Sequence, residues 1–552
     1  MNGKIKIGLL LDSYLLPAWK YKTIEGIALS DFASVSLVIK NESKSPVSES
    51  RKNRGPFVYR LHRKFDRFLF NRKPDYSEKI SLKPLINNIP EIQINAGGNG
   101  NPVGFGTKEI DEIRKYNLDI ILKYGYENLT GQILTLPRFG VWVYMMDNFD
   151  TEQEGTSGYF EVVTGNPVTV SALVKLGDGE DENQVISGAY EATCAYSVNL
   201  NRDKLFWRAS LFTLRAIFGI FKYDESYLER LKGKFRDDLL RQAGLRPPSS
   251  GSSIRYFGKA LTIILSKIVK KIFYSDPFSW MLLFRIGNAG DFKNNSYDSF
   301  RKLQPSKDRF WADPFVLRSN GSYNIFVEEF IYKKNKGHIS VLQLDGEGNL
   351  QNVKRLIEKP YHMSYPFIFE SLGSHYMIPE TGENKTIDIY KCTGFPDSWV
   401  FVKSLMKDIN AYDTTMFNYN GKWWLFALVD EINCPSGESP ELFLFYADDF
   451  MSDKWISHPY NPIVSDIRTS RPAGNIFIHD GKIYRPSQDC SGRYGKAFNI
   501  IQILTINEKE YKEKEVIKVS PDWEKRLKGA HTFNFSGDFT IIDTYTFRRR
   551  AI

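Results

Sequence analysis

The chain has 552 residues, more than one hydrophobic core usually supports, so we expect two or three domains. It is 42% hydrophobic and 25% charged, as globular proteins are, and its net charge of +9 is spread too thinly to predict nucleic-acid binding. Four cysteines without a CxxC pair argue against a disulfide framework and a zinc site, and we predict no metal. Without a signal-peptide pattern or an apolar run of about 18 residues, we expect a cytoplasmic protein.

The first 200 residues alternate between strand and helix patterns. An apolar run at 4–11 indicates a buried parallel strand, and a helical periodicity with Ile24 and Ile27 follows it. The further predicted elements are a strand at 34–39, an amphipathic stretch at 59–70 within a basic insertion, a helix at 108–115, and strands at 118–122 and 140–144. This rhythm predicts a doubly wound α/β domain of the Rossmann type over residues 1–200.

Residues 201–280 are predicted to form a helical connector. Its clearest boundary is a Pro/Ser/Gly linker at 244–253. The helix expected at 254–274 is amphipathic and basic, with Leu261, Leu265 and Ile268 on one face. Two interpretations stay open for this helix. It packs on a neighbouring domain, or it lies on a membrane surface, which would place the protein at the inner face of the membrane.

Short strands separated by glycine-containing turns fill residues 281–552. Five similar units recur about 50 to 60 residues apart, each with a strand, a tight turn and a second strand. The units begin at Ala312, Tyr365, Thr414, Pro472 and Thr532, and their turn glycines are Gly321, Gly373, Gly421, Gly481 and Gly537. Five units of this length predict a five-bladed β-propeller with four-stranded blades.

Polar residues stand where the strands of these units approach the expected axis. Those at or before the first strands are Asp313, His362, Ser364, Asp413, Arg468, Arg471 and His531, and those that end second strands are Glu328, Glu329, Glu380, Gln488 and Asp489. Polar residues at such positions can cap blades and tie neighbouring blades together. Because the whole set converges on one axis, we also predict a polar ligand pocket there.

Several motifs, in order, give the second half of the chain a family resemblance. They are Phe310-Trp-Ala-Asp-Pro-Phe, His362-Met-Ser-Tyr-Pro-Phe, Ala411-Tyr-Asp-Thr, Arg471-Pro-Ala-Gly and Arg485-Pro-Ser-Gln-Asp-Cys. Over about residues 280–520 the chain resembles the N-terminal domain of plant glucosamine inositolphosphorylceramide transferases. That domain looks like the five-bladed propeller of arabinanase and xylosidase-type glycoside hydrolases, in which an Asp-Pro aspartate is the general base. The resemblance implies this role for Asp313.

The next two blades depart from the hydrolase pattern. The second blade begins Ser364-Tyr-Pro in place of a carboxylate, and the third offers Asp413 in place of a glutamate. Because glycoside chemistry needs two opposed carboxylates, we predict Asp413 or Glu380 as the partner of Asp313. Transfer in the plant enzymes is attributed to a separate C-terminal domain, so the resemblance implies sugar handling more firmly than transfer.

The N-terminal domain resembles formyltransferases over about residues 4–195. The resemblance lies in Leu118-Asp-Ile-Ile-Leu-Lys-Tyr-Gly, Leu136-Pro-Arg-Phe-Gly-Val-Trp, Gly158-Tyr-Phe-Glu-Val and Asn166-Pro-Val-Thr-Val. That family catalyses with an Asn-x-His pair, but Trp142 and Tyr144 stand at these positions. Without the imidazole, formyl transfer loses its acid–base group, so we predict a domain that no longer formylates.

Three functions follow from these observations. The first is an enzyme of surface polysaccharide or glycolipid assembly that acts on a glycosidic or sugar-phosphate linkage, with Arg468 and Arg471 as anion binders. The second is a non-catalytic glycan-binding module. The third is a sugar N-formyltransferase that uses formyl-tetrahydrofolate, the one cofactor among the three. The expected partners are a sugar, a nucleotide-sugar or a lipid-linked glycan, with no nucleic acid.

Overall fold

The computed structural model describes residues 3–42, 57–94, 105–125, 129–145, 158–179, 182–231, 235, 250–287, 292 and 297–549. The chain divides into two compact units, Met1–Ile263 with Ile432–Ser439, and Ile264–Glu431 with Pro440–Ile552. The division falls inside helix α10 (Ser250–Phe273), so the last four residues of the predicted linker are helical. Residues 244–249 of that linker lie outside the described residues, and the domain limits at 200 and 280 stay predictions.

The first unit is built on a seven-stranded sheet with the order β5-β3-β1-β6-β7-β8-β9. The pairs from β5 to β7 are parallel, and the last two pairs are antiparallel. The strands are β1 (Ile5–Leu11), β3 (Ala33–Asn41), β5 (Glu91–Ile94), β6 (Ile120–Lys123), β7 (Val141–Met145), β8 (Val168–Lys175) and β9 (Gln184–Ala192). The strand order reverses around β1, as in doubly wound folds, and the predicted α/β domain is confirmed.

Helices pack on this sheet through apolar faces. They are α1 (Ala18–Leu29), α2 (Phe57–Phe70), α3 (Lys83–Ile86), α4 (Thr107–Arg114), η2 (Gln132–Leu134), α5 (Tyr159–Thr164), α6 (Val198–Ala209), α7 (Phe212–Tyr223) and α8 (Ser226–Leu231), and β2 (Leu15–Pro17) pairs with β4 (Lys79–Ser81). Ile110 and Ile113 of α4, for example, join Leu37 and Ile121 of the sheet in one core. The fully buried Arg208 of α6 pairs with Glu191 of β9 at 2.9 Å, which ties that helix to the sheet.

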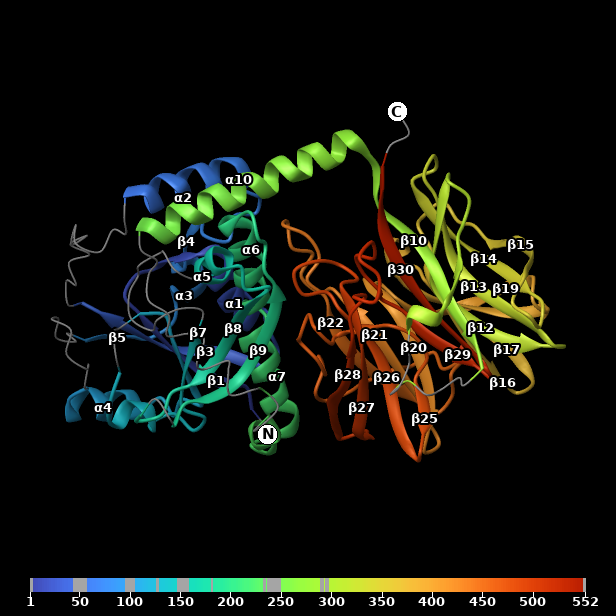
Figure 1. The fold of residues 1–552 in the computed structure, drawn as a ribbon. Coiled ribbons are helices and arrows are strands. Elements are labelled where there is room, and N and C mark those ends of the chain that lie inside the picture. The colour runs from blue at the N-terminus through green and yellow to red at the C-terminus, as the bar shows by residue number, and fades with distance from the viewer. Residues whose placement is uncertain are drawn as a thin grey trace. The chain divides into compact units, whose positions relative to one another are not determined.

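Two amphipathic helices, α2 and α10, lie side by side (Figure 1), and they match the helical stretches predicted at 59–70 and 254–274. The ring of His62 meets that of Tyr256 at 5.0 Å, and the ring of Phe65 meets that of Phe257 at 6.4 Å. Tyr256 and Ala260 of α10 are buried against α5 and α6. One face of α10 is therefore packed on the α/β domain. Among the described helices, none is both long and apolar enough to cross a membrane.

The second unit is a five-bladed β-propeller, as the repeats predicted. Its blades, from the innermost strand outward, are β12-β13-β14-β15, β16-β17-β18-β19, β20-β21-β22-β23, β24-β26-β27-β28 with β25 on β26, and β29-β30-β10-β11. The first strand of each of the first three blades contacts that of the next, and β29 returns to β12, so these strands surround the axis. The backbone N–H of Phe533 donates to the carbonyl of Ala473 at 2.8 Å and links the last two blades.

The strand bounds follow the repeat. They are β10 (Tyr274–Ile286), β11 (Arg301–Leu303), β12 (Arg309–Ser319), β13 (Ser322–Ile331), β14 (Lys336–Leu344), β15 (Leu350–Ile357), β16 (Ser364–Ser371), β17 (Ser374–Glu380), β18 (Thr386–Gly394), β19 (Ser398–Lys407), β20 (Ala411–Tyr419), β21 (Lys422–Val429), β22 (Glu441–Ala447), β23 (Ile456–Ser457), β24 (Arg471–Pro472), β25 (Phe477–His479), β26 (Lys482–Asp489), β27 (Ala497–Asn507), β28 (Glu510–Val519), β29 (Phe533–Ser536) and β30 (Phe539–Arg549), with η5 (Tyr297–Ser299) and η6 (Gly382–Asn384) between strands. Tight turns with positive φ at Asn320-Gly321 and Asn420-Gly421 join inner strands, as two-residue hairpins require.

Candidate functional site at the propeller axis

Three neighbouring blades bend their innermost strands at the same place. The pairing register shifts around Asp313 in β12, around Tyr365 in β16 and around Asp413 in β20. These residues have φ angles of +50°, +41° and +47°. A left-handed backbone costs a non-glycine residue about 1–2 kcal/mol, and such strain persists mainly where the surrounding structure enforces it. Three strained residues at equivalent positions therefore indicate a functional constraint at the axis.

Asp313 belongs to a buried chain of hydrogen-bonding groups that runs through His531 to Asp543. His531 Nε2 lies 3.5 Å from Asp313 Oδ1, and His531 Nδ1 lies 2.7 Å from Asp543 Oδ2. The hydroxyl of Thr532 donates to Asp313 Oδ1 at 3.1 Å. The ring of Trp280 stacks on His531 with centroids 3.9 Å apart. The imidazole is thus held between two carboxylates in one orientation, an arrangement suited to moving a proton.

The surroundings of Asp313 and His531 shift their pKa values in a way that suits acid–base chemistry near neutral pH. Burial, with help from the charges of Asp413 and Asp543, raises the pKa of Asp313 to about 6 against the opposing charge of His531. Burial alone would lower the pKa of His531, but the carboxylates of Asp543 and Asp313 outweigh it and raise that pKa. A general base is most effective when its pKa lies near the operating pH.

A second group of charges adjoins the first. Arg471 Nε donates to Asp413 Oδ2 at 2.5 Å, and Arg471 Nη2 lies 3.9 Å from Glu380 Oε2. The guanidinium also stands 4.9 Å from the ring of Tyr494, a side chain that is 39% exposed and so connects the group to solvent. The contact with Asp413 is made through Nε, so the anion-binding role predicted for Arg471 would fall to its Nη groups.

Two glutamates beside these groups favour the protonated form. Burial, together with the charge of Asp413, raises the pKa of Glu380 well above its usual value despite Arg471. Burial and the charges of Asp313 and Glu380 raise the pKa of Glu328 in the same direction. A neutral carboxyl group beside an ionised one is the pairing that glycoside chemistry uses, since one protonates the leaving oxygen while the other acts as base.

Tyr365 occupies the position where the hydrolase pattern has a carboxylate. Its backbone N–H donates to Asp313 Oδ2 at 3.3 Å, and its hydroxyl accepts the N–H of Gly474 at 2.8 Å and lies 2.9 Å from Thr415 Oγ1. The fully buried side chain therefore crosses from the second blade to the third and fourth. It organises the axis but supplies no charge there.

The other predicted site residues fall into two groups. His362 and Gln488 adjoin the cluster, since His362 Nε2 lies 3.4 Å from Glu328 Oε1 and Gln488 is paired with Arg471 across the strands. Ser364 is buried opposite Glu380 in its blade. Arg468 and Asp489 have other partners: Arg468 pairs with Asp466 of its own loop at 2.6 Å, and Asp489 pairs with Lys518. Alternation along β26 turns Asp489 to the opposite face from Gln488.

Glu328 belongs to the predicted polar set and joins the cluster, where it stands opposite Ala312 as Glu380 stands opposite Ser364. Two further residues of the cluster, Asp543 and Tyr365, were not predicted as site residues. Asp543 is the one acidic residue of β30 and is fully buried, where a charge is costly without partners. Tyr365 could have been found only from its bulge, which leaves no mark in the sequence.

The set Asp313, His531 and Asp543 also has the composition of a metal site, although the sequence predicted none. One ligand atom from each lies within 4.8 Å of the others, the one such group among the described residues. The 2.7 Å contact between His531 and Asp543 already occupies Nδ1. This direct pairing favours a proton-transfer role over metal ligation.

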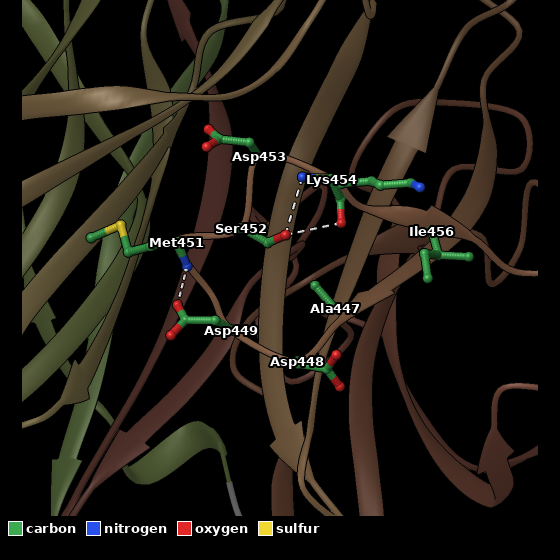
Figure 2. A pocket seen from close by; sticks show the side chains of 8 residues that line it. All are labelled: Ala447, Asp448, Asp449, Met451, Ser452, Asp453, Lys454 and Ile456. Atoms are coloured by element: carbon green, nitrogen blue, oxygen red, sulfur yellow. Dashed lines mark hydrogen bonds between the residues drawn. The ribbon is translucent and has the colours of Figure 1, made fainter.

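A hollow of about 460 Å³ lies elsewhere on the propeller, around the loop between β22 and β23 (Figure 2). Figure 2 shows Asp449 and Ser452 turned back on their own loop, where they accept the backbone N–H groups of Met451 and Lys454 at 2.7 and 3.1 Å. Asp453 pairs with Lys403. These side chains stabilise the loop, and none belongs to the axial cluster, so the axis remains the stronger candidate.

Trp142 and Tyr144, which the predicted resemblance places at the catalytic pair of formyltransferases, have structural roles here. Trp142 is buried and its Nε1 donates to the carbonyl of Phe139 at 3.0 Å. The hydroxyl of Tyr144 lies 2.5 Å from Thr213 Oγ1, and its ring meets that of Trp19 edge to face at 4.9 Å. Both side chains therefore contribute to packing and hydrogen bonding within the domain.

The fold and cluster define a five-bladed propeller with buried acid–base groups at its axis, joined to an α/β domain. Residues 301–541 match the family described as glucosamine inositolphosphorylceramide transferase 1, N-terminal, so the predicted resemblance is confirmed for the propeller. The enzyme of that name from Oryza sativa subsp. japonica is 32% identical over 228 residues, which are 41% of this chain. The match covers 30% of the rice protein's length.

Two solved structures are similar at low scores. A family 117 glycoside hydrolase from Zobellia galactanivorans has a TM-score of 0.32 and 13% identity, with 49% of this chain and 91% of that chain covered. Glycinamide ribonucleotide transformylase 1 from Symbiobacterium toebii has a TM-score of 0.27 and 12% identity, with 40% and 90% covered. Scores this low add nothing to what the strands themselves show, and formyltransferase ancestry of the N-terminal domain stays a prediction.

Proposed function

We propose that the propeller axis is a carbohydrate site of glycolipid or surface polysaccharide assembly, with Asp313 as its base. The observation that carries this proposal is that three neighbouring blades place a strained, non-glycine residue at equivalent positions around the axis. One of the three is Asp313, a buried carboxylate whose pKa is about 6. The family match supports the substrate class, because the rice relative is named for a transferase of glucosamine and inositolphosphorylceramide. A sugar on a lipid-linked headgroup is therefore the substrate to test first.

In this proposal, two carboxyl groups take opposite roles. Asp313 is largely ionised at pH 7 because that pH lies above its pKa, so it accepts a proton from an attacking hydroxyl or water. His531 lies beside the proton taken up by Asp313, and the Asp543 carboxylate balances the positive charge of the imidazole when it is protonated. Glu380, with its raised pKa, stays protonated and donates to the leaving oxygen of a glycosidic or sugar-phosphate linkage.

A non-catalytic glycan-binding module is the second candidate. Tyr365 favours it, because the second blade contributes a neutral hydroxyl, already bonded to Thr415 and Gly474, where the hydrolase pattern has a carboxylate. A sugar N-formyltransferase with formyl-tetrahydrofolate is the third. The engagement of Trp142 and Tyr144 in packing argues against it.

Ligand binding and turnover, measured on the full chain, separate these functions. Calorimetric titration with glucosaminyl inositol phosphate, nucleotide-sugars, neutral oligosaccharides and a folate would compare the wild type with Asp313→Asn. Asp453→Asn, in the hollow of Figure 2, is the matched control because it removes the same charge outside the axis.

We expect a sugar ligand to bind the wild type and Asp453→Asn alike, and turnover to be lost in Asp313→Asn. Binding without turnover in any protein supports the glycan-binding module. If Asp453→Asn abolishes binding and Asp313→Asn retains it, the binding site lies in the hollow of Figure 2 and not at the axis. Folate binding alone revives formyl transfer.

A further inference from the structure

The paired helices α2 and α10 expose apolar side chains on the side away from their packed face. Leu61, Phe65 and Phe68 follow the i, i+4, i+7 spacing of one helix face, and Ile254, Phe257 and Leu261 follow i, i+3, i+7 on the other helix. We call these six residues the two-helix surface. All six are exposed, and Phe68 is 82% exposed. The edge-to-face contact of Phe65 with Phe257 joins the two rows into one patch.

These rows are not the faces that hold the helices to the domain. His62 and Asp66 of α2 are buried, and so are Tyr256 and Ala260 of α10. An ordinary surface helix turns one apolar stripe inward and polar residues outward. Here a second apolar stripe faces outward on both helices, and on α10 it continues through the exposed Leu265 and Ile268. Contiguous exposed apolar surface of this kind marks an interaction site.

Although the net charge of +9 was expected to be thinly spread, most of it lies on the same two helices. Nine lysines and arginines and a single aspartate lie within their 38 residues, so they carry +8 of the net charge of +9. The aspartate is Asp66, which is buried, while Lys64, Arg255 and Lys259 are exposed. Arg67 is partly neutralised by Asp75 at 2.7 Å. Apolar rows flanked by basic residues match the composition of helices that lie in the interface of an anionic membrane.

We propose that the two-helix surface binds the surface of an anionic lipid bilayer, with the apolar rows inserted among the headgroups and the basic residues beside lipid phosphates. Like charge on both partners disfavours a second copy of the chain as the occupant. The cytoplasmic leaflet is the anionic surface that a cytoplasmic protein meets. This inference does not rest on the proposed function of the propeller.

Flotation of the full chain with lipid vesicles tests the proposal without any sugar ligand. Vesicles of phosphatidylcholine alone are compared with vesicles that also contain phosphatidylglycerol. We expect binding to the anionic vesicles that weakens as salt rises, since exposed charges are screened. Each of Lys64→Gln and Arg255→Gln should weaken binding about fivefold at low salt, from about 1 kcal/mol for each basic residue at the surface.

The apolar contribution is tested by Phe68→Glu and Phe257→Glu, which should each reduce binding at least tenfold. Leu29→Glu is the matched control, because Leu29 is 80% exposed at the end of α1 and lies outside the two-helix surface. Thermal unfolding checks that every variant folds as the wild type does.

Three results overturn the proposal. They are equal flotation of Phe68→Glu and Leu29→Glu, equal binding to neutral and anionic vesicles, and no binding at all. Self-association of the wild type that Phe68→Glu abolishes, seen by sedimentation velocity, would instead assign the surface to a second copy. Because the vesicles carry no glycan, each result stands whether or not the propeller binds sugar.

Discussion

Replacing Asp313 with asparagine should stabilise the propeller at neutral pH while it removes the proposed base. The folded state raises the pKa of this carboxyl from 3.8 to about 6. Between these values the folded chain holds a proton that the unfolded chain has released, so stability falls as pH rises through this window. At about 1.4 kcal/mol per pKa unit, the wild type has lost about 3 kcal/mol by pH 7. Asparagine carries no charge at any pH and avoids this loss.

The gain is reduced because asparagine offers one oxygen where aspartate has two. With that oxygen toward the backbone N–H of Tyr365, the amide nitrogen faces the hydroxyl of Thr532, which loses its acceptor, and this costs about 1 kcal/mol. We therefore expect a net gain of about 2 kcal/mol at pH 7 to 8, or roughly 4 to 8 °C in the melting temperature of a domain this size. At pH 4 the variant should be slightly less stable than the wild type.

Scanning calorimetry at a series of pH values is the assay, because the two units of the chain are expected to give separate transitions. The decisive quantity is the difference in the melting temperature of the propeller between Asp313→Asn and the wild type, followed as a function of pH. A variant that is less stable by the same amount at every pH would refute the reasoning, since it would show that Asp313 is held in the folded state without an electrostatic cost.

The remaining expectations use the same calorimetric measurement. Asp543→Asn should destabilise the propeller by about 3–5 kcal/mol, because the buried carboxylate pairs with His531. It should also lower the pKa of His531, which NMR titration would measure. The stabilisation by the protonated imidazole, which is lost as pH rises through this pKa, would then be lost at a lower pH. Tyr365→Phe should cost about 1–3 kcal/mol, because the Gly474 N–H loses its acceptor. Leu372→Asn should stabilise by about 1 kcal/mol, since Leu372 has φ +51° and is 90% exposed. If the stability of any of these variants is unchanged or changes in the opposite direction, the contact or strain on which its prediction rests is contradicted.

The propeller was predictable because its repeat has a local cause. Each inner hairpin needs a residue with positive φ in its turn, and the turn glycines at similar spacing made the five units visible. The axial position of Asp313 and Asp413 followed, because equivalent places in neighbouring blades converge. The α/β domain was predictable for a similar reason, since the apolar run of β1 is typical of a strand buried in a parallel sheet.

What the sequence could not show depends on distant partners. Arg468 and Arg471 look alike in the sequence, yet only Arg471 reaches the cluster, because Asp466 engages Arg468 in its own loop. Asp543 enters the site through His531, and neither residue carries a local pattern that reveals the other. The strand β10 was also not predicted beside β30, since a pairing between residues so far apart leaves no periodic signal.

Because β10 pairs with β30, the site can form only late in the synthesis of the chain. In the fifth blade, β10 pairs with β30, which is made about 260 residues later, and Leu282 stands opposite Asp543. His531 and Asp543 arrive with the same late segment that closes the ring. A nascent chain with four finished blades therefore has Asp313 in place but no imidazole beside it. The groups that we propose for acid–base chemistry therefore come together only once the ring is complete.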